Sequence, residues 1–296
     1  MKFNGEWNFS KAVEVQLLRQ TKPMKISIIT ATWNSAETVR DTFDSVLRQN
    51  YKDYEYIVVD GASTDGTVDI IREYEPRFEG RMRWVSEKDA GLYDAMNKGI
   101  DMATGEVVGM LNSDDFYTSF DVLKAIARRF EKYPDTDAVY GDVRYVEWED
   151  VTRTLRFYSS RLFRRSWMRM GFMPAHPSFY CRKAVYDRFK LDGTKIEGFK
   201  GDPHRAYFNT TYKIAADFEC LLRMIFVGRI RTHYLWKDCV TMRAGGVSSS
   251  GMKSHQQINR DHRRAFRENG VYSNYLLISV RYLYKIAELA LGRIRK

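Results

Sequence analysis

Two regular patterns of apolar and polar residues run through the first half of the chain. Short apolar runs rich in β-formers, KISIITAT at 25–32 and YEYIVVDG at 54–61, predict buried strands. The segment between them, 34–49, has its apolar residues at helical spacing, with Asn34 and Glu37 as a candidate N-cap and capping-box pair. The pattern therefore predicts a helix that connects two buried strands.

The same alternation continues along the chain. Further strands are predicted at 82–87, 106–112 and 137–146, with helices at 63–75, 91–103 and 121–133. This spacing predicts an α/β fold of three layers, α/β/α, with a mainly parallel central sheet. The irregular region 151–215 is followed by a helix at 215–226, a strand and Gly/Ser loop at 237–252, and C-terminal helices that divide near 269–270.

Charge adds information about the C-terminus. The 296 residues carry a formal net charge of +10, and residues 252–296 hold ten Lys/Arg against three Asp/Glu. Such a basic tail suits nucleic acid, an anionic membrane or a phosphorylated substrate. The N-terminus is polar and no apolar run reaches about 18 residues. We therefore expect a cytoplasmic protein without signal peptide or transmembrane helix.

Side chains with functional chemistry follow successive strands. Ligands of open α/β sheets bind beyond the carboxyl ends of the strands. Trp33 follows the first strand and offers a face on which a base can stack. Asp60 ends the second strand and can accept a hydrogen bond from a ring N–H. Taken singly, Trp33 is equally a half-buried aromatic and Asp60 a turn residue, and Lys88 and Lys98 suit either phosphate or a solvated helix face.

The fourth strand ends in Asn112, Ser113, Asp114 and Asp115, which places two like charges side by side. Repulsion and burial both oppose such a pair. It indicates either a solvated turn or a site for Mg²⁺ or Mn²⁺ that bridges a diphosphate. The first strand turns into its helix through TATWN, without the glycine fingerprint that brings a helix N-terminus onto a pyrophosphate. A metal at Asp114 and Asp115 would supply the missing positive charge.

Four ordered motifs, ISIITATWN, IVVDGASTDGT, SEKDAGLYDAMNKG and LNSDD, resemble the nucleotide-binding half of family 2 glycosyltransferases, which have the GT-A fold. The resemblance is strong over 24–145 and looser to about residue 250, through AHPSFY, AADFECLLR and AGGVSSS. It implies a GT-A domain at 24–250, with a nucleotide-sugar-binding half at 24–145 and an acceptor half at 146–250. Outside it lie an N-terminal extension, 1–23, and a basic amphipathic helical tail, 251–296.

The resemblance implies a role for each matched position. Trp33 takes the place of the aromatic residue that packs on the donor base, and Asp60 that of the aspartate that contacts the base, usually uracil. Residues 89–98 match the segment near the ribose, diphosphate and sugar. The implied nucleotide-sugar site comprises Ala31, Thr32, Trp33, Asp60, Lys88, Asp89, Gly91, Asp94, Asn97, Lys98, Ser113 and Asp114.

Two departures from the family pattern concern acidic residues. The first acid of the usual DxD motif is Asn112 here, so metal binding rests on Asp114 and Asp115. The usual DDGS is DGAS here, which leaves Asp60 as the only acid at that site.

The acceptor half contains three further candidates. The resemblance implies that Asp217, in AADFE, is the general base, although an acid in the first turn of a helix is also favoured by the helix dipole. It places His176 near the acceptor, where a structural hydrogen bond is the alternative. Arg243, beside AGGVSSS, suits either a diphosphate contact or a lid loop.

These roles together imply an inverting, metal-dependent glycosyltransferase that uses a nucleotide-diphospho-sugar. A UDP-sugar fits Trp33 and Asp60 best, with GDP- and dTDP-sugars as alternatives, and the acceptor is a saccharide or lipid-linked molecule. By analogy with relatives, we expect a place in bacterial surface polysaccharide assembly. The rival interpretations are a sugar nucleotidyltransferase, which would want a glycine- and basic-rich loop at TATWN, and a non-catalytic nucleotide-binding module.

The tail has two interpretations. Apolar residues lie near one helical face, among them Leu276, Val280, Leu283, Ala287 and Ala290. They suit packing on the domain or contact with an anionic membrane. Because relatives act on lipid-linked acceptors and RLFRRSWMRMGF at 161–172 has an interfacial composition, we favour peripheral membrane contact. No nucleic-acid-binding motif is present, so no nucleic acid partner is expected.

Overall fold

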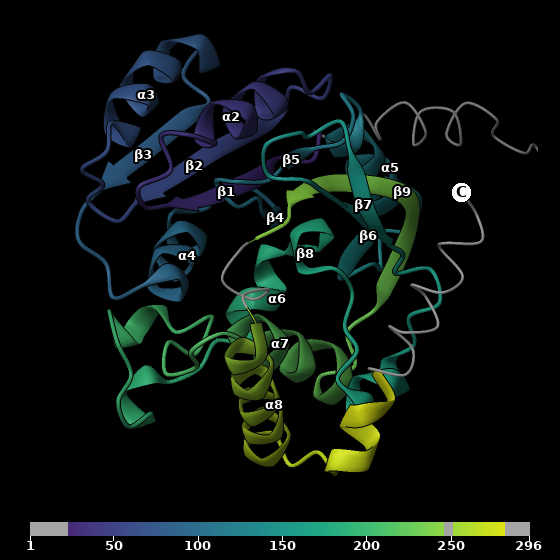
Figure 1. Cartoon of the computed structure of the whole chain (residues 1–296). Coiled ribbons are helices and arrows are strands. Elements are labelled where there is room, and N and C mark those ends of the chain that lie inside the picture. Colours follow the sequence, from purple (N-terminus) through teal and green to yellow (C-terminus); the bar gives the residue numbers. More distant parts are fainter. Residues whose placement is uncertain (1–22, 246–250, 282–296) are drawn as a thin grey trace, which may run out of the picture.

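The computed structural model of the protein describes residues 23–245 and 251–281. The expected N-terminal extension, most of the Gly/Ser loop and the last part of the tail therefore lie outside the described residues. The rest forms an α/β structure around a nine-stranded sheet (Figure 1), which confirms the expected fold class.

The first half of the sheet is parallel. Its strands are β1 (Ile26–Thr32), β2 (Tyr54–Asp60), β3 (Met82–Ser86) and β4 (Val107–Met110), in the spatial order β3-β2-β1-β4. All residues of β1, β2 and β4 are buried. Burial on both faces explains why these strands read as continuous apolar runs instead of alternating ones.

Helices cover both faces of this half, so the three-layer prediction is confirmed (Figure 1). One face packs against α2 (Val39–Leu47), α3 (Thr67–Tyr74) and α5 (Val122–Lys132), with Phe43 and Phe130 in its core. The other face packs against α4 (Leu92–Met102), α6 (Lys183–Arg188), α7 (Ala216–Leu221) and α8 (Gly251–Glu268).

The predicted start of the first helix is wrong. The helix begins at Val39, with Thr38 at the N-cap and no side-chain cap. Asn34 instead has a left-handed backbone, with φ of 47°, and its side chain accepts a hydrogen bond from the Thr64 amide at 2.9 Å. Glu37 accepts one from the Trp148 indole. Residues 33–38 therefore form a loop at the end of β1, because their polar groups bond to other loops rather than to a helix turn.

The second half of the sheet is mixed. The long strands β6 (Ala138–Val146) and β9 (Thr232–Arg243) pair in parallel, whereas β5 (Phe116–Tyr117), β7 (Thr154–Tyr158) and β8 (Tyr180–Arg182) pair antiparallel with their neighbours. The short strand β8 lies between β4 and β6 and joins the two halves. After α7 the helix widens into a π-helix, Leu222–Val227.

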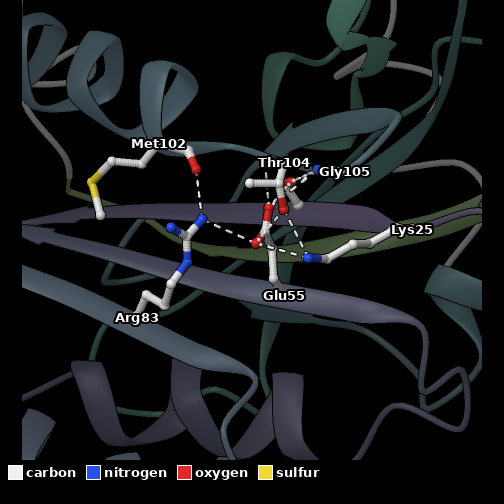
Figure 2. A network of polar contacts seen from close by, with 7 residues as sticks. Lys25, Glu55, Arg83, Met102, Thr104 and Gly105 are labelled. Carbon is white, nitrogen blue, oxygen red and sulfur yellow. Dashed lines mark hydrogen bonds and ion pairs between the residues drawn. The ribbon is translucent and has the colours of Figure 1, made fainter.

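The starting ends of the parallel strands are tied together by one buried carboxylate (Figure 2). Glu55, 5% exposed, accepts hydrogen bonds from the Lys25 ammonium at 3.1 Å, the Arg83 guanidinium at 3.0 Å and the Ser27 hydroxyl at 2.6 Å. It also accepts bonds from the Thr104 amide and hydroxyl and from the Gly105 amide. One side chain thus links β1, β2, β3 and the turn before β4.

The described part of the tail packs on the domain. Ala265 and Phe266 of α8 and Ile278 of the next helix, which begins at 275, belong to the core on that face. The interpretation of the tail as packed on the domain is confirmed for these residues. Across residues 23–245 and 251–281, no helix has the length and apolar character needed to cross a membrane.

Candidate functional site

The carboxyl ends of the parallel strands lie next to one another. Thr32 pairs with Asp60, and Asp60 pairs with Ser86, while the Leu111 amide donates to the Ile29 carbonyl at 2.9 Å. The loops that follow β1, β2, β3 and β4 therefore leave the same edge of the sheet. The structure brings together the four segments that carry the expected donor-site residues.

Asp60 organises the loop after β2. Its carboxylate is fully buried and accepts hydrogen bonds from the Ser63 amide at 3.0 Å and the Ser86 hydroxyl at 2.6 Å. The Ser63 hydroxyl donates to its other oxygen. Sequence reasoning missed both serines. Ser63 could have been found as a turn partner three residues away, but Ser86 lies on the neighbouring strand and gives no local signal.

Trp33 is held at the rim of this edge. It is 68% exposed, a high value for an indole, and it leaves a ring face open to solvent. A Cβ on Gly61 would lie 2.7 Å from the Asp89 carboxylate and 3.4 Å from the Trp33 ring, so Gly61 allows these two side chains to approach. Beneath them, Ala31 and Thr32 are buried, and the Thr32 hydroxyl has no hydrogen-bond partner within the described chain. Such orphaned hydroxyls are rare in folded proteins.

The segment after β3 contains exposed and engaged side chains. Lys88 is exposed and Asp89 is partly buried, and burial raises the pKa of the Asp89 carboxyl. The Asp89 carboxylate accepts a hydrogen bond from the Gly91 amide at 2.8 Å. Lys98 forms an ion pair with Glu87 at 2.9 Å, so its charge is already partly neutralised.

Two other residues of this segment contact the region 146–250. The Asn97 amide bonds to both backbone groups of Phe208, at 2.7 and 3.0 Å. Asp94 accepts a bond from the Ala90 amide at 2.9 Å, and its carboxylate lies where a Cβ on Gly201 would clash at 1.9 Å. In this structure both side chains are therefore occupied by protein contacts.

The turn after β4 is pinned to α2. Asp115 is only 1% exposed. Its backbone carbonyl accepts a hydrogen bond from the Thr42 hydroxyl at 2.7 Å, and its carboxylate accepts one from the Asn112 side-chain amide at 2.9 Å. Ser113 bonds through its hydroxyl to Ser35 at 2.8 Å. Burial raises the pKa of Asp114, and burial together with the charge of Asp114 raises that of Asp115. Burial therefore disfavours the charged forms of both acids, and a bound cation would favour them.

Arg243, at the end of β9, supports the same turn. It is buried, its guanidinium donates to the Asp114 carbonyl at 2.8 Å, and it forms an ion pair with Asp41 of α2. Its observed contacts are therefore with the protein. The loop that follows it lies outside the described residues beyond Gly245.

The residues present fit a divalent cation whose ligands come partly from the protein and partly from the substrate phosphates. Within 23–245 and 251–281, no group of three or more His, Cys, Asp or Glu could hold a metal alone. Asp115 is buried and bonded to Asn112, which leaves Asp114 as the more accessible carboxylate. Mg²⁺ is commonly bound by one or two carboxylates together with substrate phosphates. This donor set matches that mode and not an all-protein cage.

Asp217 and His176 interact electrostatically within the region 146–250. Asp217 lies in the first turn of α7, where its carboxylate accepts the Phe218 amide at 2.8 Å. Burial raises the pKa of Asp217 and lowers that of His176, and each charge favours the other. The His176 ring also packs edge-on against Phe208, 6.0 Å between centroids. The structure therefore brings these two sequence candidates into one electrostatic environment.

Two solved structures share this fold. The chain matches S. aureus TarS 1–349 in complex with UDP-GlcNAc with a TM-score of 0.58, at 19% identity over 80% of this chain and 66% of that one. It matches the mannosyltransferase PcManGT from Pyrobaculum calidifontis, in complex with GDP-Man and Mn²⁺, with a TM-score of 0.54, at 17% identity over 92% and 81%. The fold is that of the GT-A glycosyltransferases.

Sequence comparison identifies the family. Residues 27–189 match glycosyl transferase family 2. The PGL/p-HBAD biosynthesis glycosyltransferase of Mycobacterium bovis (strain BCG / Pasteur 1173P2) is 30% identical over 216 residues, 71% of this chain and 73% of that protein. The chain belongs to glycosyl transferase family 2, and the family expected from the four motifs is confirmed.

Proposed function

We propose that the protein is an inverting, divalent-metal-dependent glycosyltransferase that moves a sugar, of hexosyl type, from a nucleotide-diphospho-sugar to a hydroxyl group. The observation that carries this proposal is the convergence of Trp33, Asp89 and Asp114 at one sheet edge. The exposed Trp33 ring suits a base, and Asp114 suits a metal-bound diphosphate. TarS with UDP-GlcNAc and PcManGT with GDP-Man and Mn²⁺ support the donor class and the metal.

The residues of the two halves have different tasks in this scheme. When bound, the metal would stabilise the negative charge that grows on the diphosphate leaving group. Trp33 and the Asp60 loop would orient the nucleotide. Asp217 would take the proton of the acceptor hydroxyl, which attacks the anomeric carbon from the opposite face and inverts it. The raised pKa of Asp217 suits this task, because a stronger base accepts a proton more readily.

The acceptor is proposed as a saccharide or lipid-linked molecule in bacterial surface glycan assembly, and the name of the PGL/p-HBAD relative supports this setting. Contact with the inner face of the cytoplasmic membrane stays a prediction. Leu276 is 81% exposed, and Tyr272 and Tyr275 are exposed beside it. Leu283, Ala287 and Ala290 lie outside the described residues.

We expect UDP to bind in the presence of Mn²⁺ and to bind much more weakly in EDTA. Calorimetric titration of UDP and GDP measures this directly. Asp114→Asn should abolish the metal-dependent part of the affinity, because it removes the accessible carboxylate. Asp69→Asn, an exposed acid on α3, is the matched control and should bind like the wild type.

The outcomes separate the parts of the proposal. Equal UDP affinity with Mn²⁺ and with EDTA would remove the metal role and leave the transferase. Absence of binding by both UDP and GDP would reject the donor site and favour the non-catalytic interpretation. A nucleoside triphosphate and sugar phosphate converted to a nucleotide sugar would favour the nucleotidyltransferase.

Trp33→Ala should weaken nucleotide binding without changing its metal dependence. Base–aromatic stacking is worth about 1–3 kcal/mol, so the dissociation constant should rise roughly 5- to 150-fold. Trp236→Ala is the matched control, because Trp236 is 64% exposed against 68% for Trp33 but lies on β9. Equal effects of the two substitutions, in the same titration, would contradict the stacking role.

A further inference from the structure

Helix α8, in the basic C-terminal part of the chain, contains one buried acid. Asp261 of α8 is 4% exposed. One carboxylate oxygen accepts hydrogen bonds from the Ile214 amide at 3.0 Å and the Ala215 amide at 3.2 Å. The other oxygen accepts one from the Gln257 amide at 2.7 Å. The carboxylate is thus aimed at the backbone immediately before α7.

Asp261 supplies a cap that the sequence of α7 lacks. The N-cap residue of α7 is Ala215, whose methyl group cannot accept a hydrogen bond. The first amides of a helix have no acceptor within the helix, and Ala215 is buried, so its amide needs another partner. Asp261 is that acceptor, and it comes from a helix 46 residues further along the chain.

The opposite side of the same peptide segment is held by the donor half. The Tyr93 hydroxyl of α4 donates to the Ile214 carbonyl. Tyr93 lies two residues after Gly91 of the SEKDAG motif. The amide and the carbonyl of Ile214 are therefore fixed by the tail helix and by the donor-side helix, three residues before Asp217.

Phe218, the residue after Asp217, is held by a second contact with α8. The His262 ring stacks on the Phe218 ring with 3.8 Å between centroids and 17° between planes. Asp217 is thus flanked by a capped peptide on one side and a stacked ring on the other. Both supports come from adjacent residues of α8.

We propose that Asp261 is a positioning residue for Asp217, so that helix α8 contributes to the geometry of the catalytic site. This inference rests on the proposed function, in which Asp217 is the general base. Loss of the cap should let the first turn of α7 shift while the donor site, built on β1 to β4, stays intact. A catalytic group displaced by about 1 Å can cost on the order of 100-fold in rate.

The charge of Asp261 provides a second readout. The ionisable groups near Asp217 are His176, Tyr93, Cys220 and Asp261. Burial lowers the pKa of His176 and raises that of Tyr93 well above its ordinary value. Burial raises the pKa of Asp217, and the nearby Asp261 carboxylate adds to this rise.

The test compares Asp261→Ala with Glu268→Ala. Glu268 is also on α8 and accepts a hydrogen bond from the Tyr212 hydroxyl at 2.7 Å, but it does not contact the start of α7. We expect Asp261→Ala to lower kcat roughly 10- to 100-fold, with little change in UDP affinity. Glu268→Ala should lower the melting temperature by a similar amount and leave kcat near the wild-type value. Equal kcat for the two variants would overturn the proposal.

Asp261→Asn keeps an acceptor for the two amides and removes the charge, which covers the case in which Asp261→Ala fails to fold. It should retain most of kcat, and the acid limb of its pH–rate profile should move to lower pH. A kcat as low as that of Asp261→Ala would overturn the proposal, because the acceptor for the two amides is retained. If Asp217→Asn retains transfer, the base assignment of the proposed function fails; if that variant is inactive but Asp261→Ala matches Glu268→Ala, the positioning role alone fails.

Discussion

Asp217→Asn should lower the rate of sugar transfer by roughly 100- to 10,000-fold, the usual contribution of a positioned general base. Asparagine has nearly the same shape and can still accept the Phe218 amide, so the start of α7 should remain folded. UDP affinity should be unchanged, because the donor residues lie on other elements. The measurement is release of nucleoside diphosphate from a panel of nucleotide sugars with saccharide acceptors. Asp135→Asn, an exposed acid, is the control.

The pH dependence of the wild type follows from the same residue. Burial raises the pKa of Asp217, so the base becomes protonated at a higher pH than an ordinary aspartate would. The transfer rate should therefore fall on the acid side, starting above the usual carboxylate range. Asp217→Asn should abolish this limb together with most of the rate. A full rate with an intact acid limb in Asp217→Asn would exclude it as the base.

Glu55→Gln should cause the largest loss of stability among single substitutions of acids in the parallel half. Burial alone would raise the pKa of Glu55, but hydrogen bonds from Ser27, Thr104 and Lys25 outweigh it and hold the pKa at about 2 against an ordinary 4.5. A shift of this size corresponds to about 3 kcal/mol at neutral pH. For a domain of this length that is a fall in melting temperature of roughly 6–12 °C.

The sign of the pH effect distinguishes this explanation from simple packing. A carboxyl whose pKa is lowered by folding contributes stability above its unfolded pKa and loses it as the pH falls toward the folded value. The difference in unfolding free energy between wild type and Glu55→Gln should be constant above about pH 5 and shrink between pH 4.5 and about 2. Urea titrations at several pH values measure it. A difference that stays the same at pH 3 and pH 7 would contradict the prediction, and the exposed Glu79→Gln should change nothing.

The parallel half could be predicted from the sequence because its buried strands appear there as continuous apolar runs. The strands β1, β2 and β4 are buried on both faces, so apolar side chains fill nearly every position. The strands of the second half have weaker sequence patterns. The strands β5 and β8 have two and three residues, too few for any periodicity, and β9 starts five residues before the predicted strand at 237.

The candidate site shows the same division. Trp33, Asp60 and Asp114 could be singled out because each lies at or just beyond the end of a predicted strand. The partners that hold the site could not be found this way. Ser86 supports Asp60 across 26 residues of chain, and Asp261 supports Ala215 across 46. Local patterns contain no information about contacts that only the folded chain creates.

The position of β8 has a consequence for anyone who recombines relatives of this enzyme. In chain order, an exchange of donor halves invites a single crossover near residue 145. Yet Tyr180–Arg182 pairs with β4, Phe116–Tyr117 pairs with β9, and β6 pairs with β7, β8 and β9. A single crossover would therefore place five strand pairings of each chimaera between segments from different parents. To change the donor specificity, only the loops at the carboxyl edge of the sheet should therefore be exchanged. The strands should be kept, so that each still pairs with its native neighbours.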